Sequence, residues 1–449
     1  MDNGEDSFIV RGGKPLKGQI QLSGAKNVAL KVLIAALLFD SPITFKNIPR
    51  IRDINELLHL INKLGAQADF TDSNTVVVDS HGLSSDTIDL LHAAKIRASF
   101  MFFAPLLYRF GKAFIPNPGG CRLGARPIDR HISMLQAFGV KVTYNSETGF
   151  YESQLNGNSI RGTTFTFDKP THTGTELAIM LASRADGESV IKNAAQEPEI
   201  DDLINLLNQA GAHIKRENGS VLIKGTPILH YKNDSFTIMV DRNEAPTFAS
   251  FGITTRGDIM IYGIKESDIE YFATEIKNIG AGVEVLPEGI RFYYKGELKS
   301  SSITTGPHPG FMTDWQGPWA VMMTQAHGVS TIHETIFEDR FGYVSELQKL
   351  GADIEFYQPE LDNPRKIYQF NIENDDNLKS LQQAIRIKGP TQLHNGVMDV
   401  KDLRAGATIL IAACSAEGES VINGASIIDR GYEDIERKLQ SLGAAIKRV

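Results

Sequence analysis

Cysteine is scarce in this chain: its 449 residues include only Cys121 and Cys414. Two cysteines cannot build the disulfide framework that stabilises many small secreted domains, so we expect a reducing compartment. The first residues, MDNGEDSF, are acidic and lack the basic-then-apolar pattern of a secretory signal. Together these features predict a cytoplasmic protein.

Long hydrophobic runs and excess positive charge are also missing. The longest apolar stretch, 28–39, contains a lysine and is too short to cross a bilayer, so we expect a buried helix and no membrane insertion. The net charge of −8 disfavours nucleic-acid binding but leaves room for a local basic site for a small anion. No metal-ligand cluster or dinucleotide fingerprint occurs, which predicts neither a metal nor an organic cofactor.

A short phrase recurs six times along the chain. It reads KLGAQADF, AFGVKVTY, QAGAHIKR, NIGAGVEV, KLGADIEF and SLGAAIKR. The copies lie about seventy residues apart, with a longer interval before the last, and such repetition sets the architecture of a fold. Each phrase predicts a helix, a glycine in the left-handed conformation that ends it, and a strand. The shared glycines are Gly65, Gly139, Gly211, Gly280, Gly351 and Gly443.

Two kinds of helix are predicted in each repeat. Segment 53–66 shows the first kind, with Asp53 as the expected N-cap and an apolar face. That face consists of Ile54, Leu57, Leu58, Leu60, Ile61 and Leu64. The second kind is rich in small residues and apolar all round, so we expect it to be buried. Six units of alternating strands and helices predict two domains of three units, divided near 230–237.

The starts of the small-residue helices carry polar and glycine residues. Helix N-termini attract phosphate and carboxylate, so six such termini facing one cleft would bind an anion on an otherwise acidic protein. The residues at these starts are Lys26, Asn27, Arg97, Lys169, Thr173, Gly174, Asp241, Glu244, Asp314, Asp402 and Arg404.

Eight motifs identify a family resemblance over nearly the whole chain. They are LSGAKNVAL, IRAS, PGGCRLGARPIDRHI, NAAQEPEI, HPGFMTDWQ, FEDRF, DLRAGA and IDRGYE. The chain resembles the enolpyruvyl transferases, and within them the enzymes that act on UDP-N-acetylglucosamine. The resemblance implies an α/β fold, a two-domain inside-out α/β barrel with six βαβαββ-type repeats, three per domain. It places one domain at 22–230, carrying the Cys121 loop, the other at 1–21 plus 231–449, and the active site in the cleft between them.

The resemblance also implies a reaction. The enolpyruvyl group of phosphoenolpyruvate is transferred to the 3′-hydroxyl of UDP-N-acetylglucosamine and phosphate leaves, by addition to a tetrahedral ketal and then elimination. This is the first committed step of peptidoglycan synthesis. Such chemistry requires neutralised anions, a base for the hydroxyl, an acid for the methylene carbon and exclusion of water. The only partners implied are these two small molecules.

The resemblance assigns roles residue by residue. The catalytic residues are Cys121, Asp314 and Lys26, with Asp314 as the base for the 3′-hydroxyl. Because TD opens a helix there, Asp314 is also a candidate N-cap, and the two roles are compatible. The residues for phosphoenolpyruvate are Lys26, Asn27, Arg97, Arg126 and Arg404. The residues for the UDP-sugar are Asn27, Arg97, Ile128, Asp129, Arg130, Lys169, Thr173, Gly174, Asp314 and Ile336. Further positions that align with the sugar or the closed cleft are Glu197, Asp241 and Arg340.

The two cysteines have different surroundings. Glycines at 119, 120 and 124 flank Cys121, which predicts an exposed, mobile loop. Arg122 and Arg126 favour its thiolate, whereas desolvation in a closed site favours the thiol, and both remain open. Cys414, in ILIAACSAEG, is expected to be a small buried hydrophobe.

The chain departs from the family pattern at 169–176, KPTHTGTE. We expect His172 to be in solvent rather than against a ligand, whereas the neighbouring threonine hydroxyls could donate to a diphosphate. This departure keeps two alternatives open: an enolpyruvyl transferase with another nucleotide or sugar acceptor, and a binding paralogue without turnover.

Overall fold

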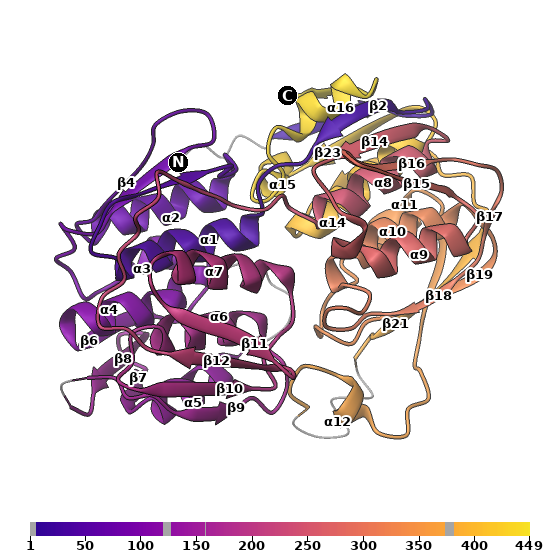
Figure 1. Cartoon of the computed structure of the whole chain (residues 1–449). Helices are drawn as coiled ribbons and strands as arrows, with labels where there is room; N and C mark the ends of the chain where they lie inside the picture. Colours follow the sequence, from indigo (N-terminus) through magenta and orange to yellow (C-terminus); the bar gives the residue numbers. More distant parts are fainter. Residues whose placement is uncertain (1–5, 120–126, 158, 373–380) are drawn as a thin grey trace. The chain divides into compact units, whose positions relative to one another are not determined.

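The computed structural model describes residues 6–119, 127–157, 159–372 and 381–449 (Figure 1). The described residues form two compact units. The first unit contains 6–23 and 240–449, and the second contains 24–119 and 127–239. Six sheets are present among the described residues, three in each unit.

The second unit holds three sheets of mixed or antiparallel strands. The first sheet comprises β3 (Ile43–Lys46), β4 (Gln67–Phe70), β5 (Val76–Asp79) and β13 (Phe236–Thr237). The second comprises β6 (Lys112–Pro116), β7 (Val140–Asn145) and β8 (Phe150–Leu155). The third comprises β9 (Thr164–Thr166), β10 (Glu188–Lys192), β11 (His213–Glu217) and β12 (Ser220–Lys224). Its helices are α1 (Lys26–Ala35), η1 (Ala36–Leu38), α2 (Arg52–Lys63), α3 (Leu90–Ala93), η2 (Arg97–Phe102), α4 (Phe103–Phe110), α5 (Asp129–Ala137), α6 (His172–Ala182) and α7 (Pro198–Gln209).

The first unit joins the start of the chain to its second half. Strand β1 (Ser7–Arg11) pairs antiparallel with β23 (Glu419–Asn423) and β24 (Ala445–Arg448), and β2 (Lys17–Gln21) pairs parallel with β14 (Asp258–Tyr262). The other strands are β15 (Gly282–Leu286), β16 (Gly289–Tyr293), β17 (Leu298–Lys299), β18 (Ser302–Thr304), β19 (Ala326–His333), β20 (Asp353–Tyr357), β21 (Ala384–Gly389) and β22 (Val397–Asp399). The helices are α8 (Glu244–Thr254), η3 (Glu266–Asp268), α9 (Glu270–Asn278), η4 (Thr313–Trp315), α10 (Gln316–Thr324), α11 (Val344–Lys349), α12 (Pro364–Ile367), α14 (Leu403–Ser415), α15 (Ala425–Ile428) and α16 (Ile435–Ser441).

The predicted helix–glycine–strand phrase is confirmed at all six positions. Each glycine has a positive φ, between +83° and +99°, which an L side chain rarely adopts. The helices that end just before these glycines are α2, α5, α7, α9, α11 and α16, and the strands that follow are β4, β7, β11, β15, β20 and β24. The apolar face predicted for 53–66 is buried as well. The sequence pattern therefore identifies these elements correctly.

The small-residue helices are buried, as predicted. Every residue of α8 is buried, and α8, α10 and α14 pack against one another. Small residues permit this close packing: a Cβ on Gly317 of α10 would lie 2.1 Å from Oγ1 of Thr408 on α14. The apolar stretch 28–39 forms buried α1 and η1.

The predicted N-cap at Asp53 is wrong. Helix α2 begins at Arg52 with Ile51 in the cap position, and no side chain caps it. Asp53 lies in the first turn, and its carboxylate instead forms an ion pair with Lys26 of α1. The local sequence favours a cap, but the charge of a residue far away in the sequence determines where this side chain binds.

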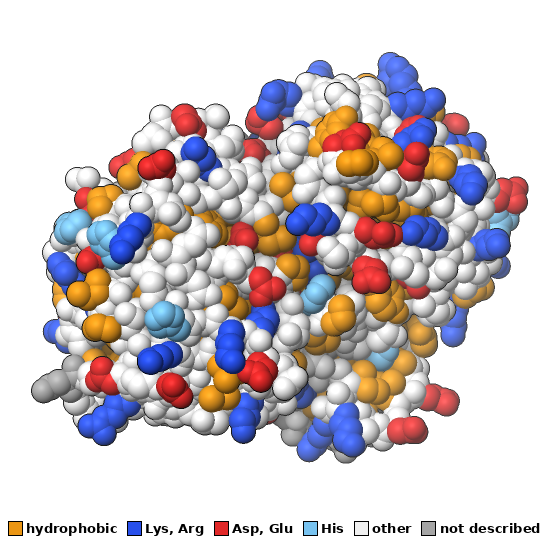
Figure 2. Space-filling view, in the orientation of Figure 1, with side chains coloured by type: hydrophobic (Ala, Val, Ile, Leu, Met, Phe, Trp, Pro, Cys, Tyr) orange, Lys and Arg blue, Asp and Glu red, His pale blue; other side chains and the backbone are white. Residues whose placement is uncertain are grey.

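Two features concern nucleic-acid and membrane binding: the distribution of charge on the surface, and the length and apolarity of the helices. On the face shown in Figure 2, basic and acidic side chains are interspersed rather than gathered into one basic patch. Among the described residues, no helix is long and apolar enough to cross a membrane.

Candidate active site

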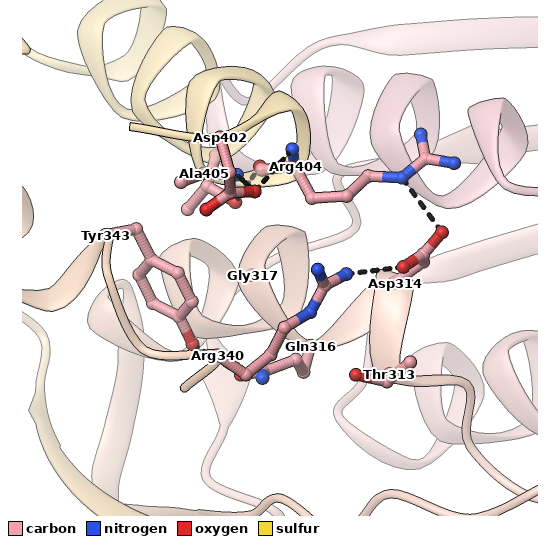
Figure 3. Close-up of a pocket in the computed structure, with 10 residues that line it drawn as sticks. Thr313, Asp314, Gln316, Gly317, Arg340, Tyr343, Asp402, Arg404 and Ala405 are labelled. Atoms are coloured by element: carbon pink, nitrogen blue, oxygen red, sulfur yellow. Dashed lines mark hydrogen bonds and ion pairs between the residues drawn. The ribbon is translucent and has the colours of Figure 1, made fainter. Parts of the chain in front are cut away.

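Asp314 lies between two arginines in the first unit (Figure 3). Its Oδ2 accepts a hydrogen bond of 2.9 Å from Nε of Arg404, the second residue of α14. Its Oδ1 accepts a hydrogen bond from Arg340, in the segment between β19 and α11. The alternative of Asp314 as an N-cap is wrong, because Met312 occupies the cap position of η4 without a side-chain bond. The carboxylate thus binds the two guanidinium groups rather than a helix terminus.

The arginines of this pocket are held in their charged form. Burial by itself disfavours the charge of Arg340, but Asp314, Asp402 and Glu334 outweigh burial and raise its pKa. The pKa of Arg404 is likewise raised, because its carboxylate and phenol neighbours outweigh burial. The Asp314 side chain is 23% exposed, whereas that of Arg340 is 4% exposed. Arg340 and Arg404 are therefore permanent positive charges, and each is paired with Asp314.

Two further side chains fix Arg404. Oδ1 of Asp402 caps α14 by accepting from the backbone N–H groups of Arg404 and Ala405, at 2.9 and 3.1 Å. The hydroxyl of buried Tyr432 accepts from Nη1 of Arg404 at 2.9 Å and shares a 2.8 Å hydrogen bond with Thr247. The motif IDRGYE contains Tyr432, but sequence reasoning assigned this residue no role in the site.

Glu334 is a second residue that sequence reasoning missed. It is fully buried, and its carboxylate accepts hydrogen bonds from the segment around Asp314 and from the segment that precedes Arg340. The donors are Oγ1 of Thr313 (2.9 Å), Nε2 of Gln316 (3.0 Å), and the backbone N–H groups of Ile336 (2.7 Å) and Phe337 (3.1 Å). The predicted substrate residue Ile336 thus has its N–H engaged by Glu334. A buried carboxylate with four donors orders the loop from which Arg340 extends.

Asp241 belongs to the same unit. It is 4% exposed, its N–H donates to the carbonyl of Ser23 at 2.8 Å, and its charge contributes to the raised pKa of Arg404. The structure therefore brings together four predicted site residues of the first unit: Asp241, Asp314, Arg340 and Arg404.

Lys26 and Asp53 form a buried ion pair in the second unit. Their Nζ and Oδ2 atoms are 2.7 Å apart, and the two side chains are only 11% and 8% exposed. Lys26 is the first residue of α1, and Asn27 beside it is partly buried. Asp53 supplies a negative charge to the Lys26 ammonium in this structure, and the role of Lys26 in binding phosphoenolpyruvate stays a prediction.

A buried histidine organises the nucleotide-side residues of the second unit. His131 lies on α5, its Nε2 shares a 3.0 Å hydrogen bond with Thr173 of α6, and its ring meets that of Phe100 edge-on. Burial and the charges of Arg97 and Arg130 lower the pKa of His131 to about 3, so it is neutral. His131 contacts elements that carry five predicted site residues, namely Arg97 of η2, Asp129 and Arg130 of α5, and Thr173 and Gly174 of α6. No sequence signal distinguished it from an ordinary core histidine.

Arg130 and Lys169 lie close to each other. Arg130 binds Asp168 through two hydrogen bonds, of 2.7 and 3.1 Å, which lower the pKa of that carboxyl. Partial burial and the charge of Arg130 lower the pKa of Lys169. Two further residues predicted for the UDP-sugar differ in exposure: Asp129 is exposed, whereas Ile128 is 3% exposed and occupies the cap position of α5.

The expectation that His172 lies in solvent is wrong. Its Nε2 lies 3.2 Å from Oε1 of Glu176, one helical turn further along α6, and Glu176 is fully buried. Glu197, 7% exposed at the start of α7, adds a second negative charge near the imidazole. Thr171 caps α6 by accepting from the N–H of Gly174 at 3.3 Å. The neighbouring carboxylates draw the ring inward.

The cysteine loop lies outside the described residues, as do its predicted site residues Cys121 and Arg126. Gly119, just before it, has a definite packing role. A Cβ there would lie 1.7 Å from the carbonyl oxygen of Ala94, so only glycine fits this close approach. Cys414 is buried as predicted, and burial raises its pKa to about 12.

Comparison with known proteins gives consistent results. Residues 10–439 match the family described as EPSP synthase (3-phosphoshikimate 1-carboxyvinyltransferase). The chain is 37% identical to a UDP-N-acetylglucosamine 1-carboxyvinyltransferase of Sphingopyxis alaskensis, over 99% of both chains, and 38% identical to one of Desulfatibacillum aliphaticivorans, over 99% of this chain and 100% of that protein.

Solved structures share the fold. The enolpyruvyl transferase NikO from Streptomyces tendae matches with a TM-score of 0.84 at 21% identity, over 99% of both chains. EPSP synthase from Acinetobacter baumannii matches with a TM-score of 0.69 at 16% identity, over 99% of this chain and 100% of that one. The α/β fold predicted from the sequence is therefore confirmed.

Proposed function

The chain belongs to the enolpyruvyl transferase family, and we propose that it transfers the enolpyruvyl group of phosphoenolpyruvate to the 3′-hydroxyl of UDP-N-acetylglucosamine, releasing phosphate. The observation that carries this proposal is the full-length similarity to enzymes named for this reaction, at 37 and 38% identity. The Asp314 pocket supports it, because the pocket combines two fixed cations, Arg340 and Arg404, with the carboxylates of Asp314 and Asp402.

Binding of phosphoenolpyruvate is assigned to Lys26, Arg97, Arg126 and Arg404, with Asn27 beside them. Arginine meets phosphate or carboxylate through two parallel hydrogen bonds, and a buried lysine adds a point charge. The Arg404 side chain is held at one end by Tyr432 and pairs with Asp314 through Nε. An anionic group of the substrate competes with Asp314 for this guanidinium, so substrate binding loosens the Arg404–Asp314 pair.

Asp314 then acts as the base. Its Oδ2 takes the proton of the sugar 3′-hydroxyl while Arg340 keeps the carboxylate oriented. The alkoxide oxygen forms a bond to C2 of phosphoenolpyruvate, and C3 takes a proton, which gives the tetrahedral ketal. Loss of phosphate from C2 and of a proton from C3 restores the double bond. Cys121 and Lys26 are the groups proposed to supply and remove protons, with Cys121 also a candidate for assisting product release.

The nucleotide is assigned to the other predicted residues. Ile128, Asp129 and Arg130 serve the uracil, Lys169 the uridine and diphosphate, Thr173 and Gly174 the diphosphate, and Ile336 the sugar or the closed cleft. Burial and the charge of Arg130 lower the pKa of Lys169, and two neighbouring cations suit a diphosphate.

The finer architecture is part of the proposal. We assign six βαβαββ-type units, three at 22–230 and three at 1–21 plus 231–449, to an inside-out barrel. Three sheets in each unit and six helix–glycine–strand phrases support this assignment. We also place the enzyme in the cytoplasm, because phosphoenolpyruvate and nucleotide sugars are intracellular metabolites.

A panel of acceptors tests the proposal. Phosphoenolpyruvate is incubated with the protein and UDP-N-acetylglucosamine, UDP-glucose or UMP, and products are identified by mass spectrometry. An enolpyruvyl adduct formed fastest on UDP-N-acetylglucosamine is expected. A faster reaction with an acceptor that lacks the acetylated sugar would favour another specificity, which the unusual 169–176 segment motivates. Ligand-induced thermal stabilisation without any product would indicate a binding paralogue.

A further inference from the structure

One family motif, IDRGYE, has no role in the reaction described above, although its tyrosine contacts a residue of the Asp314 pocket. Tyr432 lies between α15 and α16 in the first unit and is 1% exposed. Its hydroxyl accepts a hydrogen bond of 2.9 Å from Nη1 of Arg404, and Cζ of Arg404 lies 5.3 Å from the centroid of its ring. This buried residue therefore contacts a cation that is assigned to the substrate.

A chain of buried hydrogen bonds fixes Tyr432 in turn. The hydroxyls of Tyr432 and Thr247 of α8 lie 2.8 Å apart, and that of Thr247 donates to the carbonyl of Asn243 at 3.4 Å. Oδ1 of Asn243 accepts from Nε1 of Trp315, the residue after the proposed base, at 3.0 Å. Thr247, Asn243 and Trp315 are each at most 3% exposed. The chain therefore connects Arg404 to the segment that carries the base.

The three nitrogens of the Arg404 guanidinium have different partners. Nε donates to Asp314 and Nη1 to Tyr432, each over 2.9 Å. Nη2 donates to none of the described residues, and the side chain is 11% exposed. Because a guanidinium is planar and rigid, holding two of its nitrogens also fixes the direction of the third. Nη2 is thus the nitrogen that remains for an anion.

The Tyr432 hydroxyl is a neutral acceptor. Burial raises its pKa, and the opposing effect of the Arg404 charge does not outweigh burial. A neutral phenol oxygen orients the guanidinium without cancelling its positive charge, whereas the carboxylate of Asp314 does both. Arg404 therefore keeps a full positive charge for a substrate anion when its bond to Asp314 loosens.

Resting on the proposed function, we propose that Tyr432 is the positioning residue for phosphoenolpyruvate binding by Arg404. The substrate anion competes with Asp314 for the guanidinium, and the Tyr432 hydroxyl holds Nη1 in place while Nε leaves the carboxylate. Thr247 orients the phenol, so the motif IDRGYE and helix α8 act on the substrate through Arg404. Loss of a hydrogen bond to a charged group weakens binding by about tenfold or more.

The test is calorimetric titration of the full chain with phosphoenolpyruvate and, separately, with UDP. Tyr432→Phe removes the hydroxyl but keeps the ring, and it should bind phosphoenolpyruvate about tenfold more weakly. Its affinity for UDP, which the proposed function does not assign to Arg404, should stay within about twofold of wild type. Tyr368→Phe is the matched control and should behave as wild type. Tyr368 is also 1% exposed, its hydroxyl shares a 3.1 Å hydrogen bond with His333, and neither residue lines the Asp314 pocket.

A second variant separates positioning from folding. Tyr432→Phe leaves the buried hydroxyl of Thr247 without its closest partner, which lowers stability. The double variant Tyr432→Phe with Thr247→Val removes both hydroxyls, so thermal unfolding should show recovered stability. Its affinity for phosphoenolpyruvate should nevertheless stay about tenfold below wild type, because Arg404 still lacks its acceptor. If Tyr432 had a structural role alone, this affinity would recover together with stability.

The outcomes discriminate between the two proposals. Wild-type-like binding of phosphoenolpyruvate by Tyr432→Phe overturns this inference, even if transfer to UDP-N-acetylglucosamine is observed. Recovered affinity in the double variant, or an equal loss of UDP affinity in both variants, also overturns it. A Tyr432-dependent affinity for phosphoenolpyruvate without enolpyruvyl transfer upholds this inference and overturns the proposed function. If the wild type does not bind phosphoenolpyruvate, both are overturned.

Discussion

Arg404 donates its Nε–H to Oδ2 of Asp314 over 2.9 Å, although 90 residues separate the two in the sequence. The cation proposed to bind phosphoenolpyruvate and the base proposed for the sugar hydroxyl thus bind each other directly. Because an anionic substrate competes for the same guanidinium, this pair links binding of one substrate to activation of the other.

Replacing Asp314 by Asn tests its role as base. The amide keeps the shape but cannot take the hydroxyl proton, so we expect kcat to fall by about a hundredfold or more while the fold is retained. Phosphate release measures the rate, and circular dichroism measures folding. Asp258→Asn, which removes a carboxylate paired with Arg291 on the surface of the same unit, is the control. An Asp314→Asn rate within about threefold of wild type would exclude proton abstraction by this residue.

Replacing Asp53 by Asn leaves Lys26 without its buried carboxylate. Breaking a buried pair costs about 3 to 5 kcal/mol, so thermal unfolding should begin several degrees lower. Phosphoenolpyruvate should stabilise this variant more than wild type, because it supplies the missing negative charge. Glu217→Gln breaks the exposed Lys215 pair and should have almost no effect. Equal stabilisation of variant and wild type by phosphoenolpyruvate would argue against a role for Lys26 in binding it.

The two thiols should differ in reactivity. Burial raises the pKa of Cys414 to about 12, so hardly any thiolate forms at neutral pH. An epoxide of the fosfomycin type, which resembles phosphoenolpyruvate, is expected to alkylate Cys121 alone, as mapped by peptide mass spectrometry. Cys121→Ser should abolish labelling and Cys414→Ala should retain it. Label on Cys414, or none on the folded protein, would refute the assignment of Cys121.

Asp202 of α7 predicts a pH effect on stability. Burial raises its pKa to about 6, although it accepts the N–H of Met239 at 2.7 Å. The folded protein holds this proton more tightly than the unfolded chain, so the stability contribution is present at low pH and is lost as pH rises from about 4 to about 6.

The variant Asp202→Asn removes this titration and retains an acceptor for Met239. Above pH 6 it should be more stable than wild type by on the order of 2 kcal/mol, and near pH 4 it should be similar. Denaturant unfolding at the two pH values measures the difference, with exposed Asp234→Asn as the control. A variant that is less stable than wild type at neutral pH would contradict the effect of burial.

Local patterns in the sequence predicted the elements that local physics determines. Gly65 and its five counterparts end helices in the left-handed conformation because other residues avoid it, so the repeat was visible in the sequence. Burial of α8 and α14 followed from their apolar composition.

Side-chain partners were not predictable in the same way. Asp53 was expected to cap α2 and Asp314 was a candidate cap for its own helix, but both bind cations from distant segments. His172 was expected in solvent because Glu176, although only one turn away, gives no sign in the sequence that it is buried beside Lys31. Ion pairs that form only in the folded protein decide where these side chains lie, so the sequence alone does not predict them.

The most direct test of the account is phosphate release by the wild-type protein with phosphoenolpyruvate, measured with and without UDP-N-acetylglucosamine. We predict release that requires both substrates and that is reduced by about a hundredfold in Asp314→Asn. Absence of release when folded protein is given both substrates would contradict the assigned transfer, and release without the nucleotide sugar would show a different reaction.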